Sequence, residues 1–324
     1  MIEELNDYGK RKIPILFIID FDIKNPIIIP LDKVNKKEIL YNINGKKNYN
    51  NKKNKIKKNI VFKKYPVKLR TYKKAFKKVK KELYKGNSFL LNLTFPTRIR
   101  TNLTFKEIFY NSIAKYKLLY KDLFIVFSPE QFVTIMDNKI SSFPMKGTIN
   151  ASIPGAKEKI LADEKEFAEH ITIVDLIRND LGIISKEVIV DNFRYIDEVF
   201  ALEQNLLQVS SKITGILDKY WNNRLGDIIY SLLPAGSVTG APKKKTVEII
   251  KNAENYDRGY YTGIFGYFDG EILDSSVMIR FMEKKDDKFF FKSGGGITIY
   301  SKLKYEYKEL KDKVYVPFNR DNKD

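Results

Sequence analysis

The hydrophobic pattern of the chain alternates between short apolar runs, which are typical of strands, and longer periodic stretches, which are typical of helices. Residues 13–20 (IPILFIID) form an apolar run between charged segments and predict a buried strand. Residues 72–84 carry apolar side chains at helical spacing among lysines and predict an amphipathic helix, which Gly86 ends. A further strand is predicted after this helix, over residues 89–95 (FLLNLTF).

The clearest helix signature covers residues 163–181. Asp163 and Glu166 form a capping-box pattern at its start, and Gly182 ends it. Its apolar stripe consists of Phe167, Ile171, Val174 and Ile177. We therefore expect one long amphipathic helix in this region.

Two hairpins are predicted nearer the C-terminus. Asp269 and Gly270 separate two strand-like runs, as in a two-residue hairpin turn. A charged turn over residues 284–288 joins the strand-like runs SSVMIRFME and KFFFKSGGGIT. Consecutive hairpins interrupted by long helices indicate an α+β fold with antiparallel sheet rather than a doubly wound α/β fold.

The length of 324 residues suits one large domain or two closely fused domains. No apolar run approaches the ~20 residues that a membrane-spanning helix needs. The N-terminus lacks the basic-then-apolar layout of a signal peptide, so we expect a soluble protein of the cytoplasm without a membrane partner. The absence of cysteine excludes disulfides and thiolate–metal sites.

The formal net charge of +19 makes nucleic-acid binding an alternative function. The densest basic run, residues 45–59, places asparagines between its lysines and offers only Tyr49 for stacking on bases. We therefore interpret the stretch from about residue 42 to residue 64 as an exposed low-complexity loop, and we expect no nucleic-acid partner. A steep salt dependence of nucleic-acid binding would mark the alternative.

Two pairs of glutamates, each spaced by three residues, are candidate metal ligands. Glu166 and Glu169 share one face of the predicted helix. Glu306 and Glu309 repeat the spacing near the C-terminus. Magnesium typically takes one or two protein carboxylates and completes its octahedron with water and substrate oxygens. Two pairs facing one cleft would suit magnesium, whereas either pair alone is more often solvent-facing charge on a helix.

Two glycine-containing segments are candidate anion sites. The turn LPAGSVTGAPKKK (residues 233–245) precedes a helix, with Pro242 set for its first position, and free N–H groups at such a start bind anions. The segment SGGGIT (residues 293–298) ends a strand in three glycines, which let the backbone approach a ligand closely. Arg280, on the preceding strand, could bind a carboxylate bidentately. An ordinary turn and a surface arginine are the alternative interpretations.

Lys146 is a candidate nucleophile. The segment FPMKGT (residues 143–148) places it in a short apolar loop rather than in a run of solvated lysines. A desolvated lysine loses its proton more easily and can then attack an electrophile. A lysine with its head group in solvent is the more common case.

Together these motifs resemble the chorismate-utilising enzymes, which include the anthranilate, aminodeoxychorismate, isochorismate and salicylate synthases. The resemblance covers about residues 87–318. The motifs stand in family order: SPEQF (128–132), PMKGT (144–148), E-x-x-E-H into VDLIRNDLG (166–182), PAGSVTGAPK (234–243), RGYYTGIFGYFDG (258–270), IR (279–280), GGGIT (294–298) and E-x-x-E-x-x-x-K (306–313).

The resemblance implies an α+β fold of the anthranilate synthase component I type. In that fold two antiparallel sheets pack together, with helices outside and the site between the sheets. It also implies a single chorismate-binding catalytic domain over residues 1–324. Typical relatives carry an N-terminal extension with a tryptophan pocket and an L-L-E-S-type motif, which we do not find here, so we expect that extension to be absent.

The resemblance further implies a magnesium cofactor and a set of site residues. Glu169 and Glu309 would hold magnesium directly, and Glu166 and Glu306 would act through waters. The ion would bridge to the ring carboxylate of chorismate. The residues expected to bind the substrate are Ser237, Thr239, Tyr261, Arg280, Gly294, Gly295, Gly296 and Lys313.

Lys146 favours one group within the family. Anthranilate and isochorismate synthases usually have alanine at this place, whereas aminodeoxychorismate synthases have lysine. In that group the lysine is thought to attack ring carbon C2 as the C4 hydroxyl leaves, and ammonia then enters at C4 and expels the lysine. The product is 4-amino-4-deoxychorismate, a precursor of para-aminobenzoate and folate. Glu130 matches the family carboxylate proposed to protonate the departing hydroxyl.

Ammonia is expected from a separate glutaminase subunit, because the chain has no cysteine for glutamine hydrolysis. Leu90 stands where isochorismate-forming relatives carry a water-activating lysine, which argues against water as the nucleophile. Gln208 stands where lyase-type relatives and many aminodeoxychorismate synthases have histidine, which weakens the case for pyruvate elimination. The one histidine of the chain, His170, lies beside Glu169. Anthranilate synthase component I and a degenerate, inactive binding relative are the alternatives within the family. The intact lysine, glutamate pairs and glycine turns argue against an inactive relative.

Overall fold

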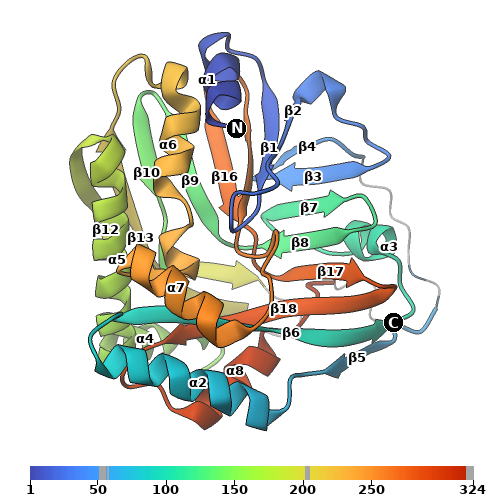
Figure 1. Cartoon of the computed structure of the whole chain (residues 1–324), viewed down its shortest axis with the longest axis vertical. Coiled ribbons are helices and arrows are strands. Elements are labelled where there is room, and N and C mark those ends of the chain that lie inside the picture. The colour runs from blue at the N-terminus through green and yellow to red at the C-terminus, as the bar shows by residue number, and fades with distance from the viewer. Residues whose placement is uncertain (51–55, 57, 201–204, 319–324) are drawn as a thin grey trace. The chain divides into compact units, whose positions relative to one another are not determined.

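The computed structural model of the chain describes residues 1–50, 56, 58–200 and 205–318. These residues fall into two compact units. The first unit comprises residues 1–33, 130–237 and 264–277, and the second lies within residues 34–129, 238–263 and 278–324. Each unit is built on one nine-stranded sheet (Figure 1). Both units combine segments that are distant in the sequence, so neither is a contiguous piece of chain.

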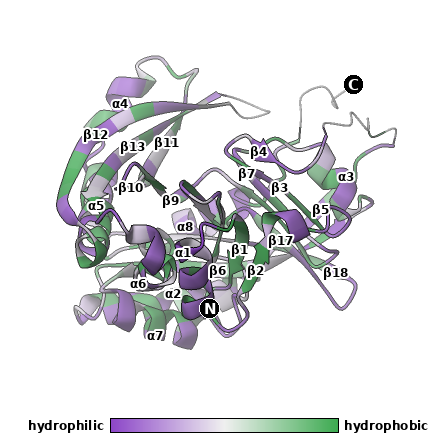
Figure 2. Ribbon diagram, turned by 90° about the horizontal axis from the view of Figure 1, so that it is seen from above, coloured by the Kyte–Doolittle hydropathy of each residue, from purple (hydrophilic) through white to green (hydrophobic). Residues whose placement is uncertain are grey.

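The sheet of the first unit has the order β11-β13-β10-β9-β16-β15-β1-β2, with β12 also paired to β13. Its strands are β1 (Ile15–Ile19), β2 (Ile27–Pro30), β9 (Gln131–Met136), β10 (Lys139–Ser142), β11 (Met145–Asn150), β12 (Lys186–Phe200), β13 (Asn205–Ile216), β15 (Ile264–Phe268) and β16 (Leu273–Val277). Strand β1 is apolar and buried at all five positions and is coloured as hydrophobic in Figure 2. A continuous apolar run of this kind is typical of a strand covered on both faces.

The helices of the first unit include one long helix that lies along the sheet. They are α1 (Ile2–Lys10), α4 (Ala156–Ala162), α5 (Glu164–Ile184) and α6 (Leu225–Leu232), with the 3-10 turns η1 (Leu31–Lys33) and η2 (Trp221–Arg224). Helix α5 contacts β12 and β13, as Figure 1 shows. The Asp163 side chain caps α5 by accepting a hydrogen bond of 2.9 Å from the Glu166 N–H.

The sheet of the second unit has the order β14-β6-β18-β17-β8-β7-β3-β4, with β5 also paired to β6. Its strands are β3 (Ile39–Ile43), β4 (Lys46–Lys47), β5 (Phe62–Tyr65), β6 (Leu90–Thr101), β7 (Tyr116–Tyr120), β8 (Phe124–Ser128), β14 (Gly240–Ala241), β17 (Phe281–Lys285) and β18 (Lys288–Ile297). All the strand pairs of both sheets are antiparallel within the described residues.

Three helices of the second unit share a core with its two longest strands. The unit has the helices α2 (Leu69–Tyr84), α3 (Phe105–Tyr110), α7 (Lys243–Glu254) and α8 (Leu303–Asp312), of which α3 lies outside this core. The 3-10 turn η3 (Gly236–Val238) lies where the chain passes from the first unit to the second. Residues of α2, α7 and α8 form one buried cluster with β6 and β18. These three helices lie along β6 and β18 in Figure 1. The cluster fixes helix α8, and with it Glu306 and Glu309, against the glycine-rich end of β18.

The α+β prediction with two antiparallel sheets and flanking helices is confirmed. The predicted helix over residues 72–84 is α2, and its apolar stripe is buried as expected. The predicted strand over residues 13–20 is β1. The predicted strand over residues 89–95 is the start of β6, which continues to Thr101. No helix within the described ranges is both long and apolar enough to cross a membrane.

Several boundaries differ from the predictions. The hairpin at Asp269 has a four-residue connection rather than a two-residue turn, because the Asp269 carboxylate accepts hydrogen bonds from the N–H groups of Glu271 and Ile272. The run SSVMIRFME is not one strand: β16 ends at Val277 in the first sheet, and β17 begins in the second. Helix α5 continues past Gly182, which has open space around its Cβ position and no positive φ.

The segment from about residue 42 to residue 64, predicted as an exposed loop, has regular structure at both ends. Strand β4 pairs with β3, and β5 pairs with β6. The Asn48 side chain joins this segment to β3 by donating to the Ile39 carbonyl at 2.8 Å. Residues 51–55 and 57, in the middle of the predicted loop, lie outside the described residues.

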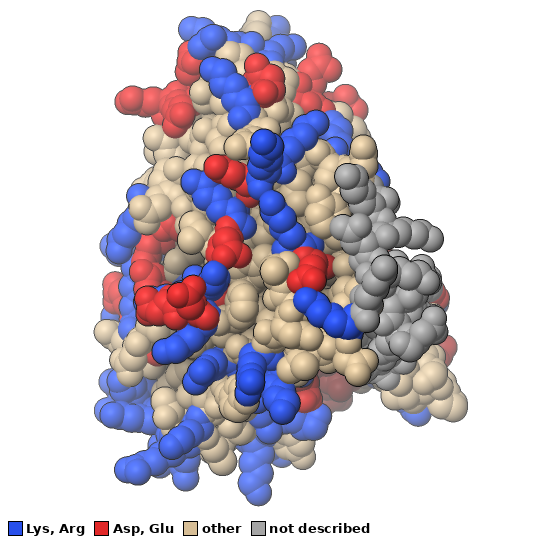
Figure 3. Space-filling view, turned by 90° about the vertical axis from the view of Figure 1, so that its right-hand side faces the viewer, with Lys and Arg blue, Asp and Glu red and all other residues tan. Residues whose placement is uncertain are grey.

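The surface carries the excess of basic residues that the composition requires. Figure 3 shows lysine and arginine side chains interspersed with acidic ones on the face that it draws, with the basic side chains more numerous. Exposed pairs such as Lys284–Asp122, at 2.7 Å, locally neutralise this charge.

Candidate functional site

Lys146 lies in a strand with a bulge rather than in the predicted loop. On β11, Met145 pairs with Ser210 of β13, and Thr148 pairs with Gln208, so β11 holds one extra residue between these pairs. Gly147 occupies this bulge with φ of 82°, a conformation that side chains rarely adopt. The bulge interrupts the regular alternation of the strand at Lys146, because an extra residue re-aims the neighbouring side chain.

The bulge brings the candidate nucleophile next to the first glutamate pair. Lys146 Nζ lies 3.5 Å from Glu169 Oε2, and the two side chains are 21% and 10% exposed. A Cβ atom at Gly147 would stand 3.2 Å from Glu166 Oε2, so the glycine leaves room for this carboxylate. Lys146, Glu166 and Glu169, which the sequence placed in two separate motifs, therefore form one cluster in the first unit.

Glu130 and Ser237 also meet in the first unit. The Ser237 hydroxyl donates a short hydrogen bond to Glu130 Oε1, although the two residues are 107 positions apart. Glu130 begins the segment that leads into β9, and its carbonyl accepts a hydrogen bond of 2.6 Å from the Ser276 hydroxyl. The residue predicted as general acid is thus held by a residue predicted to bind the substrate.

His170 is fully buried one residue after Glu169. Its Nε2 lies 2.6 Å from the Ser211 hydroxyl, which itself accepts a hydrogen bond from the backbone N–H of Arg194. Burial, together with the positive charges of Arg194 and Lys146, lowers the pKa of His170 to about 4. The imidazole is therefore neutral at neutral pH and acts in packing and hydrogen bonding of α5 against β13.

The second glutamate pair lies against the glycine-rich strand in the second unit. Glu309 Oε1 is 2.5 Å from Lys313 Nζ, and the same amine donates to the Gly294 carbonyl at 3.1 Å. A Cβ at Gly295 would stand 2.9 Å from Glu309 Oε1. Four residues from two predicted motifs therefore form a second cluster. A Cβ at Gly294 would instead stand 2.4 Å from the Leu93 carbonyl oxygen of β6, so Gly295 allows close approach of the carboxylate and Gly294 allows that of the neighbouring strand.

Glu306 is buried beneath this cluster, at 5% exposure. Burial and the charges of Glu306 and Glu309 raise the pKa of Tyr72, so the Tyr72 hydroxyl stays protonated beside both carboxylates. Tyr72 belongs to α2, whose apolar face packs on β6. No pattern in the sequence indicates that α2 contributes a polar group to this neighbourhood, because the helix is predicted from its apolar stripe alone.

The remaining predicted substrate residues also lie in the second unit. Thr239 is fully buried and Tyr261 is 3% exposed, and the Thr239 carbonyl accepts a hydrogen bond of 2.9 Å from the Asn92 N–H. Gly296 pairs with Asn92 in the β6–β18 ladder. Thr239 and Gly296 therefore both lie next to Asn92, near the start of β6.

Arg280 lies between β16 and β17 rather than on a strand, with φ of 52°. Its guanidinium carbon lies 5.1 Å from the ring centre of Tyr315. Its Nε is buried and has no hydrogen-bond partner among the described residues. Such a donor is costly to leave unsatisfied, and an anionic group of a ligand would satisfy it.

The two glutamate pairs suit a magnesium ion in their chemistry. Each pair offers carboxylate oxygens, the ligand type that magnesium prefers. Each also has a glycine close to a carboxylate: a Cβ would stand 3.2 Å from Glu166 Oε2 at Gly147 and 2.9 Å from Glu309 Oε1 at Gly295. The ammonium groups of Lys146 and Lys313 lie against Glu169 and Glu309 as stand-in cations. Within the described ranges, no three acidic or histidine side chains gather in one metal-binding group.

The structure shows a residue that sequence reasoning missed. Arg258 was part of the motif RGYYTG but received no role. It forms a nearly inaccessible ion pair with Glu254, with 2.6 Å between Arg258 Nη2 and Glu254 Oε1. The spacing of four residues is not a helical one here, because Glu254 is the last residue of α7 and Arg258 lies beyond the helix.

Comparisons with known proteins agree with these features. A family model described as chorismate binding enzyme matches residues 30–319. A protein of Haemophilus influenzae named "Uncharacterized PabA-like protein" is 50% identical over 316 residues, which are 98% of this chain and 96% of that protein. "Aminodeoxychorismate synthase component 1" of Bacillus subtilis is 30% identical over 259 residues, which are 75% of this chain and 54% of that protein.

A solved structure shares the fold. Anthranilate synthase component I from Streptococcus pneumoniae has a TM-score of 0.66 and 25% sequence identity, over 79% of this chain and 58% of that one. The fold, the ordered motifs and the family match together define an enzyme of chorismate metabolism. This chain belongs to the chorismate binding enzyme family, as the resemblance of its motifs predicted.

Proposed function

We propose that this chain is an aminodeoxychorismate synthase component I, which converts chorismate and ammonia into 4-amino-4-deoxychorismate and water. The observation that carries the proposal is the placement of Lys146 by the β11 bulge beside Glu169. The similarity to the aminodeoxychorismate synthase of Bacillus subtilis supports it. The likeness to an anthranilate synthase structure favours that activity as the second candidate.

In the proposed reaction the lone pair of the Lys146 amine forms a bond to ring carbon C2. The C1=C2 double bond shifts to C1=C6, the C5=C6 double bond shifts to C4=C5, and the C4–oxygen bond breaks. Glu130 gives its proton to the departing hydroxyl, which leaves as water. The hydrogen bond from Ser237 orients the Glu130 carboxyl group for this transfer.

Ammonia then forms a bond to C4. The double bonds return to C5=C6 and C1=C2, and the bond between C2 and Lys146 breaks, so the lysine is regenerated. The new C4 ammonium group returns a proton to Glu130. Each cycle therefore exchanges a hydroxyl group for an amino group, with water as the second product, and needs no oxidant or reductant.

Magnesium is proposed as the cofactor, and when bound it would neutralise a carboxylate of the substrate. Glu169 and Glu309 would hold the ion directly, with Glu166 and Glu306 acting through waters. Arg280, whose Nε has no partner in the described part of the chain, is proposed to bind a second substrate carboxylate. Thr239, Tyr261, Lys313 and the glycines of β18 would complete substrate binding.

The test is incubation of the purified chain with chorismate, magnesium and an ammonium salt, followed by identification of the product by mass and chromatography. The expected product is 4-amino-4-deoxychorismate. Glutamine in place of ammonium should support the reaction only when a separate glutaminase is added, since the chain has no cysteine. Release of pyruvate with formation of anthranilate would establish the second candidate instead.

A further inference from the structure

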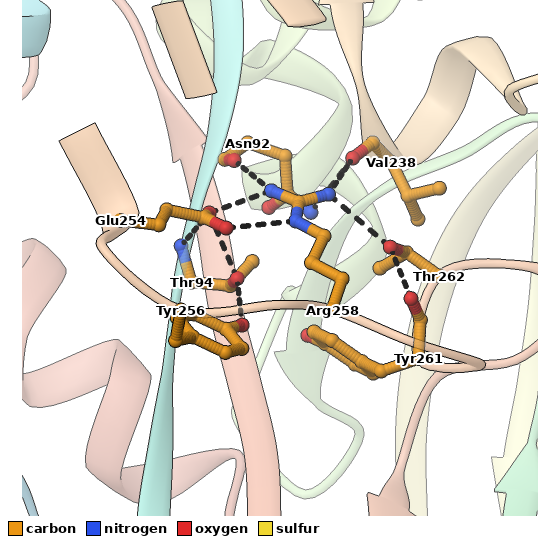
Figure 4. A network of polar contacts seen from close by, with 8 residues as sticks. All are labelled: Asn92, Thr94, Val238, Glu254, Tyr256, Arg258, Tyr261 and Thr262. Carbon is orange, nitrogen blue, oxygen red and sulfur yellow. Dashed lines mark hydrogen bonds and ion pairs between the residues drawn. The ribbon is translucent and has the colours of Figure 1, made fainter. Parts of the chain in front are cut away.

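We infer that the ion pair of Arg258 and Glu254 is a positioning device that holds the substrate-binding segments of the second unit in register. This inference rests on the proposed function, because it takes Thr239, Tyr261 and the β18 glycines as parts of a chorismate site. Figure 4 shows the network, in which a single guanidinium reaches three chain segments.

All five N–H donors of Arg258 have acceptors within the chain. Nε and Nη2 bind the two oxygens of Glu254, at 2.9 and 2.6 Å. Nη1 donates to the Val238 carbonyl at 3.0 Å and to the Thr262 hydroxyl at 3.2 Å. Nη2 also donates to the Asn92 carbonyl at 2.7 Å. A guanidinium with five donors in use and a side chain 2% exposed has no donor left for a substrate carboxylate.

The three segments that Arg258 reaches are those that carry the predicted substrate residues. Val238 directly precedes Thr239, and Thr262 directly follows Tyr261. Asn92 is the ladder partner of Gly296. The Asn92 side chain adds a second hydrogen bond to the Val238 carbonyl, at 3.1 Å. A shift of the guanidinium would therefore be transmitted to all three segments at once.

Glu254 extends the network to the next residues of β6. Its Oε1 accepts hydrogen bonds of 2.8 Å from both the N–H and the hydroxyl of Thr94. Thr94 is the ladder partner of Gly294, whose carbonyl binds Lys313. Through Asn92 and Thr94 of β6, the Arg258–Glu254 pair therefore fixes both ends of the glycine run in β18.

The backbone at Thr262 shows that the network holds a strained arrangement. Thr262 has φ of 63°, which a β-branched residue adopts at a cost of the order of 1–3 kcal/mol. Its N–H donates to the Met278 carbonyl at 2.9 Å, and its hydroxyl accepts from Arg258. The strained residue directly follows Tyr261, so the network holds the backbone next to a residue proposed to bind the substrate.

Stability alone does not account for such a pair. Apolar side chains of similar volume are often as stabilising as a buried ion pair, because both charges must be removed from water. What an apolar replacement cannot supply is five directed hydrogen bonds to fixed acceptors. The network therefore contributes geometry to the site, and its loss should be visible in substrate binding.

The test compares Arg258→Lys with wild type and with the matched control Arg100→Lys, at an exposed arginine of strand β6, which also carries Asn92 and Thr94. Initial rates of chorismate consumption are measured with magnesium and ammonium, at a temperature where circular dichroism shows each variant folded. Lysine keeps the charge but has three donors in place of five. We expect the KM of Arg258→Lys for chorismate to rise about tenfold or more with kcat within twofold, and Arg100→Lys to match wild type.

A structural role alone would lower kcat in proportion to the folded fraction and leave KM unchanged, and that result would overturn the inference. Asn92→Ala is the second variant, because it removes one side-chain hydrogen bond to Val238 and leaves the ion pair intact. Its KM should rise about threefold to fivefold. If Arg258→Lys does not fold, an unchanged KM in Asn92→Ala overturns the inference. Lack of chorismate consumption by wild type would instead overturn the proposed function, and the inference with it.

Discussion

The Arg258–Glu254 pair of the second unit and the Lys146–Glu169 pair of the first are both formed by a cation and a carboxylate. They differ in the length of their contacts and in the exposure of their side chains. Contacts of Arg258 with Glu254 are 2.6 and 2.9 Å long, and both side chains are almost inaccessible. The Lys146 amine stands 3.5 Å from Glu169, at the outer limit of a hydrogen bond, with 21% of its side chain exposed.

The difference separates a pair that holds structure from a pair that is ready for chemistry. A cation whose donors all have short, directed partners cannot move without breaking several bonds, so it fixes geometry. A lysine amine with a long contact can leave its carboxylate for a covalent state at small cost. Substitution of Arg258 should therefore lower the stability of the fold strongly, in addition to its effect on KM. Substitution of Lys146 should lower turnover and leave stability nearly unchanged.

The largest expected effect on stability is from Arg258→Met. Removing one partner of a buried ion pair leaves the other charge uncompensated, which typically costs about 3–5 kcal/mol of unfolding free energy. Urea denaturation followed by circular dichroism measures this change. The exposed arginine variant Arg100→Met should stay within about 0.5 kcal/mol of wild type. Equal unfolding free energies of the two variants would show that the buried Arg258–Glu254 pair does not stabilise the fold.

Glu169→Gln and Glu309→Gln should have the largest effect on turnover. Each substitution removes a proposed magnesium ligand, and we expect losses of at least ~10²-fold in kcat/KM. Both glutamates are partly exposed and paired with lysines, so unfolding free energy should change by about 1 kcal/mol or less. Glu164→Gln, on the exposed first turn of α5, is the matched control. Unfolded Gln variants in circular dichroism would assign these glutamates a structural role.

The effect on stability expected for Lys117 is of intermediate size. This residue extends the comparison to a buried lysine whose amine contacts backbone carbonyls instead of a carboxylate. Its Nζ donates to the carbonyls of Phe109 and Ser112, both at 2.7 Å. Burial, with a smaller contribution from the positive charge of Lys47, lowers the pKa of Lys117 to about 7. Between this value and the ordinary lysine pKa the unfolded chain binds more protons, so stability should rise with pH by up to ~1.4 kcal/mol per pH unit.

Urea denaturation at pH 7 and pH 9 checks this slope. Lys117→Met should lose the contribution of this lysine to the rise, whatever its absolute stability, while Lys115→Met, at an exposed lysine nearby, should keep it. Identical pH slopes in wild type and Lys117→Met would contradict the lowered pKa.

The smallest stability effect is expected for Lys146→Met. The pair with Glu169 is long and partly exposed, so its loss should change the unfolding free energy by less than about 1 kcal/mol. Thermal denaturation of wild type and Lys146→Met measures this difference in stability. A loss as large as that of Arg258→Met would erase the distinction between the two pairs.

Much of the fold could be predicted because its elements carry strong local patterns. Val79 and Leu83 lie on the stripe that buries α2, and the apolar run of β1 is buried throughout. The stripe of α5 was predicted less well. Val174 and Ile177 are buried, but Phe167 and Ile171 are 40% and 43% exposed. A helical period identifies an apolar face but not how far along the helix a sheet covers it.

The site could be predicted as motifs but not as contacts. Glycines and carboxylates stood out by type and spacing, whereas the hydrogen bond from Ser237 to Glu130 joins distant positions. The bulge at Gly147 depends on the register of β11 against β13, which no local pattern encodes. Arg258 was overlooked because its partners at Asn92 and Val238 are backbone carbonyls, which leave no mark in a sequence.

The most direct test of the central claim, that Lys146 is the covalent nucleophile, is intact-protein mass spectrometry of the wild type with chorismate and magnesium but without ammonia. Our account predicts an adduct with the mass of chorismate less one water, located on the peptide that contains Lys146. The adduct should disappear on addition of ammonium and should be absent from Lys146→Ala, whose turnover should fall at least ~10²-fold. An unmodified wild-type protein, together with a Lys146→Ala variant that raises KM and preserves kcat, would contradict the covalent mechanism.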